Sequence, residues 1–383
     1  MKLPPLSLYI HIPWCIKKCP YCDFNSHQAD QTIPEQDYIA CLLEDLNDQL
    51  AWAQSRELKS IFIGGGTPSL FSAVGYEQLL TEIEKKIPFA EDIEITLEAN
   101  PGTLEREKFR GYRTAGINRL SIGVQSFQPQ HLEILGRIHS DQDAIKAAQV
   151  ATEVGFDNFN LDLMFGLPQQ SEQQALADLN QAISLQPTHL SWYQLTIEQN
   201  TVFYSKPPKL PNDDAIWEIQ QTGMQYLNEH GFQQYEISAY AKGEERSSKH
   251  NLNYWTFGDY LAIGAGAHGK ITDIDNNQIF RFQKTRLPKD YLNKDKAYTS
   301  QTDVIPQEQL PFEFMMNHLR LKQSSAFNHY ESSTGLSRDT IIPVLKKAES
   351  LGLIKMNDYN FQPTDEGYIY LNNLLELFLP EDE

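Results

Sequence analysis

Six short apolar segments alternate with longer amphipathic segments over the first half of the chain. This alternation is typical of parallel strands that are joined by right-handed helical crossovers. Six repeats are fewer than a closed eight-stranded barrel needs, so we expect an α/β fold built on an open, partial (β/α)6 barrel. The expected strands are Leu8–Ile12, Ser60–Ile63, Ile93–Leu97, Arg119–Val124, Phe159–Leu163 and Leu190–Leu195.

Glycine, polar and acidic residues occur at or near the ends of five successive strands. In parallel β/α folds, the carboxyl ends of the strands build the active face. We therefore expect these residues to share one site. In chain order they are the cysteine-containing loop after Ile12, the run Gly64–Pro68, the segment Glu98–Gly102, the segment Gln125–Phe127, and Asp162.

Three cysteines stand near the start of the chain with the spacing C-x-x-x-C-x-x-C: Cys15, Cys19 and Cys22. Thiolates are the usual ligands of iron–sulfur clusters, which normally take four of them. Three thiolates would leave one iron of a four-iron cluster without a protein ligand, as a catalytic zinc site keeps one position open. A structural zinc site is the alternative, with His11 or His27 as its fourth ligand.

Composition and length limit the class of protein. The 383 residues exceed the usual size of one domain, and 40% apolar residues are enough for a core. The fourth cysteine, Cys41, lies among apolar residues at helical spacing, which favours a buried thiol over a disulfide framework. No segment is apolar for the length of a membrane span, and Pro4 and Pro5 would interrupt a signal peptide. We expect a cytoplasmic protein that is not an integral membrane protein.

The formal net charge of −19 bears on the partners of the chain. Proteins that bind nucleic acids usually carry a basic patch, because contacts with phosphate dominate their affinity. An acidic total lowers the expectation of such a patch, so we expect no nucleic-acid partner.

The sequence divides into three parts. We expect a barrel core over residues 1–235, a connecting segment over 236–305 and a C-terminal domain over 306–383. Three helices and a hairpin in the last part predict a winged-helix-like α+β domain. The acidic balance favours a packing or lid role for it over DNA binding. Its expected elements are helices at Phe312–Leu321, Ala326–Tyr330, Arg338–Ser350 and Asp365–Leu379, and strands at Leu353–Met356 and Asn360–Pro363.

The glycine run and the two strand-end acids each have a functional interpretation and a plainer one. Glycines at 64–66 would let a ligand approach the backbone and leave N–H groups free to donate, or would simply make a tight turn. Glu98 and Asp162 would accept hydrogen bonds from a ligand ammonium or from ribose hydroxyls, or would be solvated strand ends.

Two motifs lie beyond the barrel segments. His250–Trp255, with the sequence H-N-L-N-Y-W, could supply a haem ligand and a flat aromatic wall, or could be a loop whose rings fill the core. Residues 264–269 match G-x-G-x-x-G, but a dinucleotide site needs a helix there. Asn276 and Asn277 predict a hairpin instead, so we expect no such site.

Together these motifs resemble the radical S-adenosylmethionine (SAM) superfamily. Over nearly the whole chain they resemble the family of oxygen-independent coproporphyrinogen III oxidase and its relatives. Two departures from the oxidase pattern favour the haem-chaperone branch of that family: Phe24 stands where the oxidases have a fourth cysteine, and Cys15 leaves no room for their N-terminal arm. The segment His250–Trp255 matches the H-N-x-x-Y-W motif that this branch associates with haem binding.

The resemblance implies a haem chaperone that carries a 4Fe-4S cluster and SAM. It would bind haem and deliver it to an acceptor haemoprotein, such as a membrane-bound respiratory enzyme. Oxidative decarboxylation of coproporphyrinogen is the enzymatic alternative, and radical modification of tRNA is a third. The implied ligands are Cys15, Cys19 and Cys22 for the cluster, His250 for haem, and Tyr9, Tyr21, Gly65, Gly66, Thr67, Glu98, Gln125, Arg137, Asp162 and Thr196 for SAM.

Overall fold

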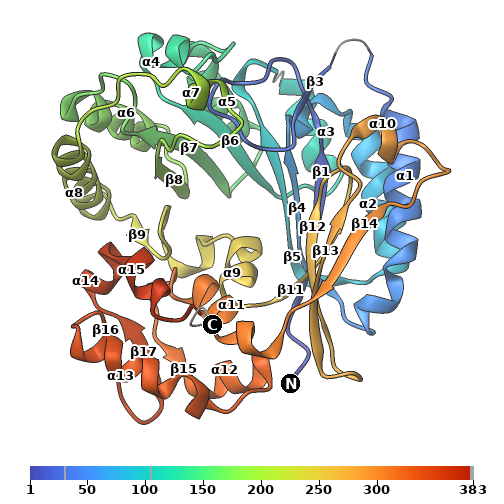
Figure 1. Ribbon diagram of the computed structural model, residues 1–383. Coiled ribbons are helices and arrows are strands. Elements are labelled where there is room, and N and C mark those ends of the chain that lie inside the picture. The colour runs from blue at the N-terminus through green and yellow to red at the C-terminus, as the bar shows by residue number, and fades with distance from the viewer. Residues whose placement is uncertain (30–31, 104–105, 380–383) are drawn as a thin grey trace.

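One curved sheet of twelve strands organises the computed structural model (Figure 1), which describes residues 1–29, 32–103 and 106–379. Across the sheet the strands are β14 (Thr299–Val304), β13 (Gln278–Lys284), β12 (His268–Asp273), β11 (Asp259–Ile263), β1 (Leu6–Ile12), β4 (Leu58–Gly65), β5 (Phe89–Ala99), β6 (Arg119–Gln125), β7 (Phe159–Phe165), β8 (His189–Gln194), β10 (Ala239–Ala241) and β9 (Gln233–Gln234).

The six central strands confirm the predicted partial barrel. β1, β4, β5, β6, β7 and β8 are neighbours in that order, and each pairs in parallel with the next. They are buried on both faces, which explains why they are nearly continuous apolar runs in the sequence. β5 starts four residues before the predicted boundary, because Glu91 and Asp92 continue the strand at its exposed end.

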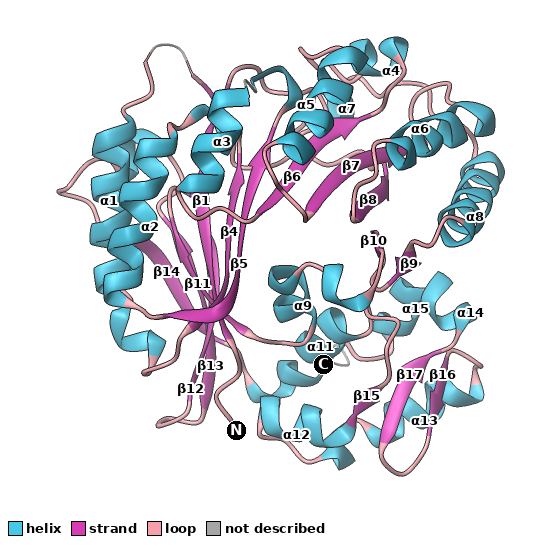
Figure 2. Ribbon diagram, turned by 180° about the vertical axis from the view of Figure 1, so that it is seen from behind, coloured by secondary structure: helices cyan, strands magenta, loops and turns pink. Residues whose placement is uncertain are grey.

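Helices cover the convex face of this sheet (Figure 2). Their apolar sides supply much of the main core, and several begin at a residue whose side chain caps the first turn. Ser140 and Ser171 each form a capping box, which satisfies backbone N–H groups at the helix start. The covering helices are α1 (Glu35–Asp48), α2 (Ala73–Lys86), α3 (Arg106–Thr114), α5 (Asp141–Glu153), α6 (Glu172–Ser184) and α8 (Asp213–Glu229).

Residues 236–305 do more than connect the two ends of the chain, because they contribute five strands to the main sheet. β11 pairs in parallel with β1, and β12 to β14 continue the sheet as antiparallel neighbours. Figure 1 shows these late strands beside the N-terminal one. Residues 264–267 form the turn from β11 to β12 with no helix, and β12 and β13 form the predicted hairpin.

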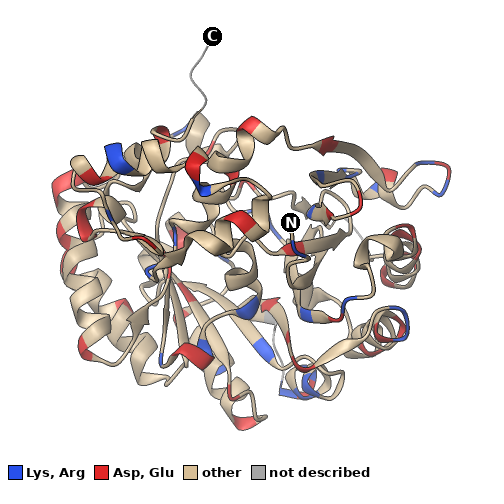
Figure 3. Cartoon of the chain, turned by 90° about the horizontal axis from the view of Figure 1, so that it is seen from below, with Lys and Arg blue, Asp and Glu red and all other residues tan. Residues whose placement is uncertain are grey.

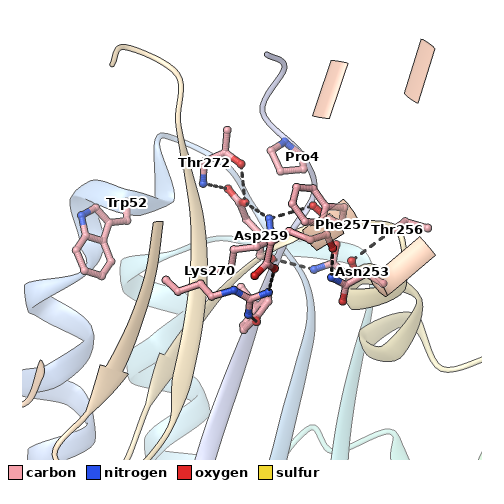
Figure 4. A network of polar contacts seen from close by, with 12 residues as sticks. Pro4, Trp52, Asn253, Thr256, Phe257, Asp259, Lys270 and Thr272 are labelled. Atoms are coloured by element: carbon pink, nitrogen blue, oxygen red, sulfur yellow. Dashed lines mark hydrogen bonds and ion pairs between the residues drawn. The ribbon is translucent and has the colours of Figure 1, made fainter. Parts of the chain in front are cut away.

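Asp259, at the start of β11, is the centre of a buried polar network (Figure 4). Its carboxylate accepts hydrogen bonds from Arg56 Nη1 at 2.7 Å, from Thr272 N at 2.9 Å and from Thr272 Oγ1 at 2.9 Å. Lys270 Nζ lies 3.2 Å from the same carboxylate. One side chain therefore joins β11, β12 and the loop before β4.

A second buried ion pair links the far side of this extension to the barrel. Lys284 Nζ, in β13, lies 2.5 Å from Asp45 Oδ1, in α1, and both side chains are fully buried. The Tyr291 hydroxyl donates to the other carboxylate oxygen of Asp45 at 2.6 Å. Charged groups are rarely buried unless they are paired, so this pair fixes where β13 lies against α1.

The C-terminal domain is a small sheet with helices around it. Its helices and hairpin overlap the predicted ranges, but the first helix ends at His318, the third is α-helical only from Ile342, and the last breaks at Tyr370 into two. Phe257 and Ile279, from the main sheet region, join its core, so the domain packs against the end of the extension. The elements are α11 (Leu310–His318), β15 (Ser325–Ala326), α12 (Phe327–Thr334), α13 (Ile342–Ser350), β16 (Ile354–Met356), β17 (Asn360–Pro363), α14 (Asp365–Ile369) and α15 (Leu371–Glu376).

The acidic residues are spread over many elements of the chain. Figure 3 shows them on many helices, with basic residues interspersed. Of the helices that the structure describes, none combines the length and the apolar character that crossing a membrane requires.

The Asp259 network can be tested by substitution. Asp259→Ala leaves Lys270 and Arg56 without their buried carboxylate, and removing one partner of a buried pair costs about 3–5 kcal/mol. We expect the free energy of unfolding, measured by urea denaturation and circular dichroism, to fall by about that amount. Glu57→Ala removes an exposed ion pair with Lys59 and should change it by less than about 1 kcal/mol. Equal effects would contradict the assignment.

Candidate functional site

The carboxyl ends of the barrel strands surround a cavity of about 370 Å³, which we call the first cavity. It brings together most of the residues that the sequence singled out. Those that line it are Cys15, Cys19, Cys22, Tyr21, Gly65, Gly66, Thr67, Glu98, Gln125, Arg137 and Asp162. The expectation of one shared site therefore agrees with the geometry for these residues.

The three cysteines lie on the loop that follows β1. Two short strands, β2 (Trp14–Cys15) and β3 (His27–Gln28), pair and close its base. All three thiols are free and face one cavity, and no group of three or more His, Cys, Asp and Glu among the described residues converges on a single metal ion. His11 Nε2 is 2.9 Å from Asn25 O and His27 Nε2 is 3.1 Å from Asn25 Oδ1. Each of the two histidines of the zinc alternative therefore has a ring nitrogen near Asn25.

Arg137 places a positive charge beside the cysteine loop. Its Nη1 donates to Cys19 Sγ at 3.7 Å, and its Nη2 donates to Asn100 Oδ1 and Gly123 O, each at 2.7 Å. The guanidinium would balance the negative charge of a metal-bound thiolate at this position. In the sequence Arg137 looks like an ordinary surface arginine, but in the structure three hydrogen bonds fix its side chain in the site.

The glycine run forms a tight turn that supports the cysteine loop, and its N–H groups are not free for a ligand. Gly66 N donates to Ile12 O and Thr67 N to Trp14 O, both at 2.7 Å, and Gly65 N donates to Glu98 Oε2 at 3.0 Å. A Cβ at Gly66 would overlap the carbonyl oxygen of Trp14. These hydrogen bonds favour the tight-turn interpretation, because the loop backbone itself makes the close approach.

Glu98, in β5, and Asp162, in β7, face the first cavity from strands that lie on either side of β6. Burial and, to a smaller extent, the nearby charge of Asp162 raise the pKa of Glu98 to about 8. Burial also raises the pKa of Asp162, against hydrogen bonds from Asn160 and Ser121. Paired carboxyls with raised pKa values are poised to accept a cationic or hydroxyl-bearing ligand.

Gln125 has an unusual backbone. Its φ of +71° lies in the left-handed region, and the register of β6 against β7 shifts between Gly123 and Gln125. Such irregularities at strand ends redirect a side chain. Here the Gln125 amide oxygen accepts a hydrogen bond from the Tyr193 hydroxyl at 2.8 Å inside the cavity.

The structure adds residues that sequence reasoning missed. Asn251, in the H-N-L-N-Y-W segment, and Glu236 line the first cavity although they lie far along the chain. Tyr193 and Ser191, at the end of β8, were missed because they belong to an ordinary half-buried strand; their place on the sixth strand of the barrel was the available signal.

Two of the expected SAM residues lie elsewhere. Thr196 is exposed in the loop after β8 and lines neither this cavity nor its neighbour. Tyr9 faces a second cavity of about 700 Å³, which Phe24, Gly65 and Glu98 also line. Because these three residues line the first cavity too, the two cavities adjoin.

His250 lies in a helix, α9 (Lys249–Trp255), rather than in a loop. Its side chain is buried, with Nδ1 3.0 Å from Ser60 Oγ and Nε2 2.8 Å from the Tyr254 hydroxyl. Burial lowers its pKa to about 3, so the ring is neutral at physiological pH. Both ring nitrogens already have partners, and a metal could bind only where one is released.

Comparison with known proteins agrees with this architecture. Residues 9–182 match the radical SAM superfamily and residues 305–370 match the HemN C-terminal domain. Proteins named heme chaperone HemW from Haemophilus influenzae and Escherichia coli are each 54% identical to this chain, over the whole of both sequences.

The chain belongs to the HemW family.

The fold of this HemW-family chain also matches a solved structure. Coproporphyrinogen III oxidase (HemN) from Escherichia coli, described as a radical SAM enzyme, superposes with a TM-score of 0.83 over 98% of this chain and 90% of its own. The sequences are 22% identical. The superposition shows that the two proteins share a fold, and the match of residues 9–182 places the barrel of this fold in the radical SAM superfamily.

The pKa of Glu98 predicts a pH dependence of stability in the cluster-free protein. Between the ordinary value of about 4.5 and the folded value of about 8, the folded chain keeps a proton that the unfolded chain releases. The free energy of unfolding therefore falls as pH rises through this window, by at most about 1.4 kcal/mol per pH unit for this one proton.

Glu98→Gln should remove this contribution, so urea titrations between pH 5 and 8 should show a flatter profile than the parent protein. Glu91→Gln, at an exposed position of the same strand, should leave the profile unchanged. If the free energy of unfolding of the Glu98→Gln variant depended on pH as steeply as that of the parent protein, the Glu98 carboxyl would ionise freely in the folded state.

Proposed function

We propose that the chain is a haem chaperone, which binds haem and transfers it to an acceptor haemoprotein. The observation that carries the proposal is the adjoining pair of cavities, one lined by three thiols and three carboxyl groups and the other by aromatic rings. The whole-length identity with relatives named as haem chaperones supports it.

The residues of the first cavity fit a 4Fe-4S cluster and SAM. Cys15, Cys19 and Cys22 would hold the cluster, and Arg137 would balance the negative charge of its thiolates. Glu98 and Asp162 would accept hydrogen bonds from the ammonium group and the ribose hydroxyls of SAM. A cluster held there would supply the electron that reductive cleavage of SAM requires.

Phe24 distinguishes this proposal from the enzymatic alternative. It stands where the oxidases of the wider family have a cysteine, and its ring is 60% exposed between the two cavities. An apolar ring there can contact a flat hydrophobic ligand but cannot bind metal or transfer a proton. This favours capture of haem over decarboxylation of coproporphyrinogen.

The acceptor on this proposal is a haemoprotein such as a membrane-bound respiratory enzyme. The chain would meet it from the aqueous side, through exposed polar surface rather than through a membrane span. Nucleic acid is not a partner on this proposal, because the net charge is −19 and acidic residues occur along many elements of the chain (Figure 3).

The cluster assignment predicts which cysteines hold iron. After anaerobic reconstitution, Cys15→Ala, Cys19→Ala and Cys22→Ala should each lose most of the roughly four iron atoms per chain, together with the visible absorbance of the cluster. Cys41→Ala is the matched control, because this thiol is buried in α1 away from the cavity, and it should keep both. Loss of iron from the control alone would contradict the assignment.

The function itself predicts saturable haem binding and delivery. Titration of the reconstituted protein with haem should saturate near one haem per chain, with a shifted Soret band. Incubation with an acceptor depleted of haem should then raise the haem content and the activity of the acceptor. Absence of saturable binding would overturn the proposal, and vinyl products from coproporphyrinogen, reductant and SAM would establish the enzymatic alternative.

A further inference from the structure

The second cavity has the size and the walls of a pocket for a flat ligand. Its volume of about 700 Å³ falls within the roughly 300–1,000 Å³ of small-molecule sites. Phe24, Phe62, Tyr254 and Tyr260 line it, and the last two rings meet edge to face with centroids 4.4 Å apart. Aromatic faces of this kind bury a planar macrocycle well.

Three histidines lie in or directly behind these walls, and they differ in what their rings already contact. His11 is 2.9 Å from the Tyr9 hydroxyl at Nδ1 and 2.9 Å from Asn25 O at Nε2. Both ring nitrogens of His250 form hydrogen bonds, one with Ser60 and one with Tyr254. His268, the first residue of β12, is exposed and lines the cavity, and its ring makes no hydrogen bond to any residue that the structure describes.

We propose that His268 supplies the imidazole that binds the iron of a haem held in the second cavity, and that Arg286 at its rim pairs with a haem propionate. This inference rests on the haem-chaperone function proposed above. In the binding step, the lone pair of one His268 ring nitrogen forms a bond to iron and displaces water from it. No electron is transferred and no other covalent bond changes.

The protonation state of His268 suits this role. Only an unprotonated ring nitrogen can bind a metal. Partial burial, with the nearby cations Arg281 and Arg286, lowers the pKa of His268 below its ordinary value. The ring is therefore neutral at physiological pH without any rearrangement of the fold.

The charges around the cavity give the haem an orientation. Arg286 is exposed, its Nε donates to Asn25 Oδ1 at 3.3 Å, and its terminal nitrogens make no hydrogen bond among the described residues. A guanidinium fork matches a carboxylate. Lys284 also lines the cavity, but Asp45 already pairs with it. Glu98 marks the border with the first cavity, so propionates are favoured at the Arg286 side.

His250 has a positioning role in this arrangement. Its ring lies 5.2 Å from that of Phe62 and 4.7 Å from that of Tyr254, measured between centroids, and both of these rings line the cavity. The hydrogen bond from its Nε2 position fixes the Tyr254 hydroxyl at 2.8 Å. The histidine of the H-N-L-N-Y-W segment thus shapes the haem wall from behind.

The test compares haem with metal-free protoporphyrin IX on the reconstituted full-length protein. His268→Ala should weaken haem binding at least about tenfold and shift the Soret band, while the affinity for protoporphyrin, measured by fluorescence, stays within about twofold. Arg286→Gln should weaken both ligands, because both carry propionates. His230→Ala, at an exposed helix end remote from the cavity, is the matched control.

Rescue by added imidazole separates a ligand from a positioning residue. With His268→Gly, imidazole should restore the parental Soret band, whereas with His250→Ala it should not, and His250→Ala should weaken haem and protoporphyrin together. The inference would be overturned if His268→Ala bound haem as tightly as the parent protein. It would also be overturned if His250→Ala, and not His268→Ala, weakened the binding of haem while leaving that of protoporphyrin unchanged. Failure of the unsubstituted protein to bind haem would instead overturn the proposed function.

Discussion

The second cavity depends on two buried carboxylates, Asp259 and Asp45, that attach the antiparallel extension to the barrel. Asp259 binds Lys270 and Arg56, and Asp45 binds Lys284. Buried ion pairs often add little net stability, since desolvation offsets their attraction, but an unpaired charge at these positions is strongly unfavourable. Each pair therefore excludes alternative registers of β12 and β13. The register sets the positions of His268, Gln283 and Arg286, which line the second cavity. It therefore also sets the shape of that cavity.

The first cavity is organised by the backbone rather than by ion pairs. The turn at Gly65 and Gly66 donates its hydrogen bonds to the strand and loop that carry the cysteines, and to Glu98. One turn thus sets the position of the thiols and of the carboxyl group together. Burial raises the pKa values of both Glu98 and Asp162, although hydrogen bonds and the charge of Arg119 oppose the shift at Asp162. At neutral pH the folded chain therefore keeps the Glu98 carboxyl protonated.

Local pattern was enough to predict the barrel and the residues on its face. Apolar strands buried on both sides have a clear signature, and the rule that strand ends meet at one edge grouped Cys15, Glu98, Gln125 and Asp162 correctly. The features that the sequence did not predict depend on contacts between segments that are far apart in the chain. Nothing local in residues 259–304 shows that β11 lies beside β1, and nothing near Gly66 shows that its donors are used by the cysteine loop. The exposure of His268 and the burial of His250 are likewise properties of the assembled sheet.

The boundary between the two cavities is where their chemistries would meet. Phe24 lies on the cysteine loop yet lines both cavities, and Glu98 and Gly65 do the same. A planar ligand in the second cavity would therefore touch the segment whose thiols face the first. Occupation of one cavity changes the solvent exposure of Phe24 and of the Glu98 carboxyl, and so changes the environment of the other. Because such coupling is reciprocal, a ligand in the thiol-lined cavity would change the affinity of the second cavity for its ligand by the same free energy as in the opposite direction. Phe24 and Glu98, which line both cavities, are the side chains through which such coupling would act.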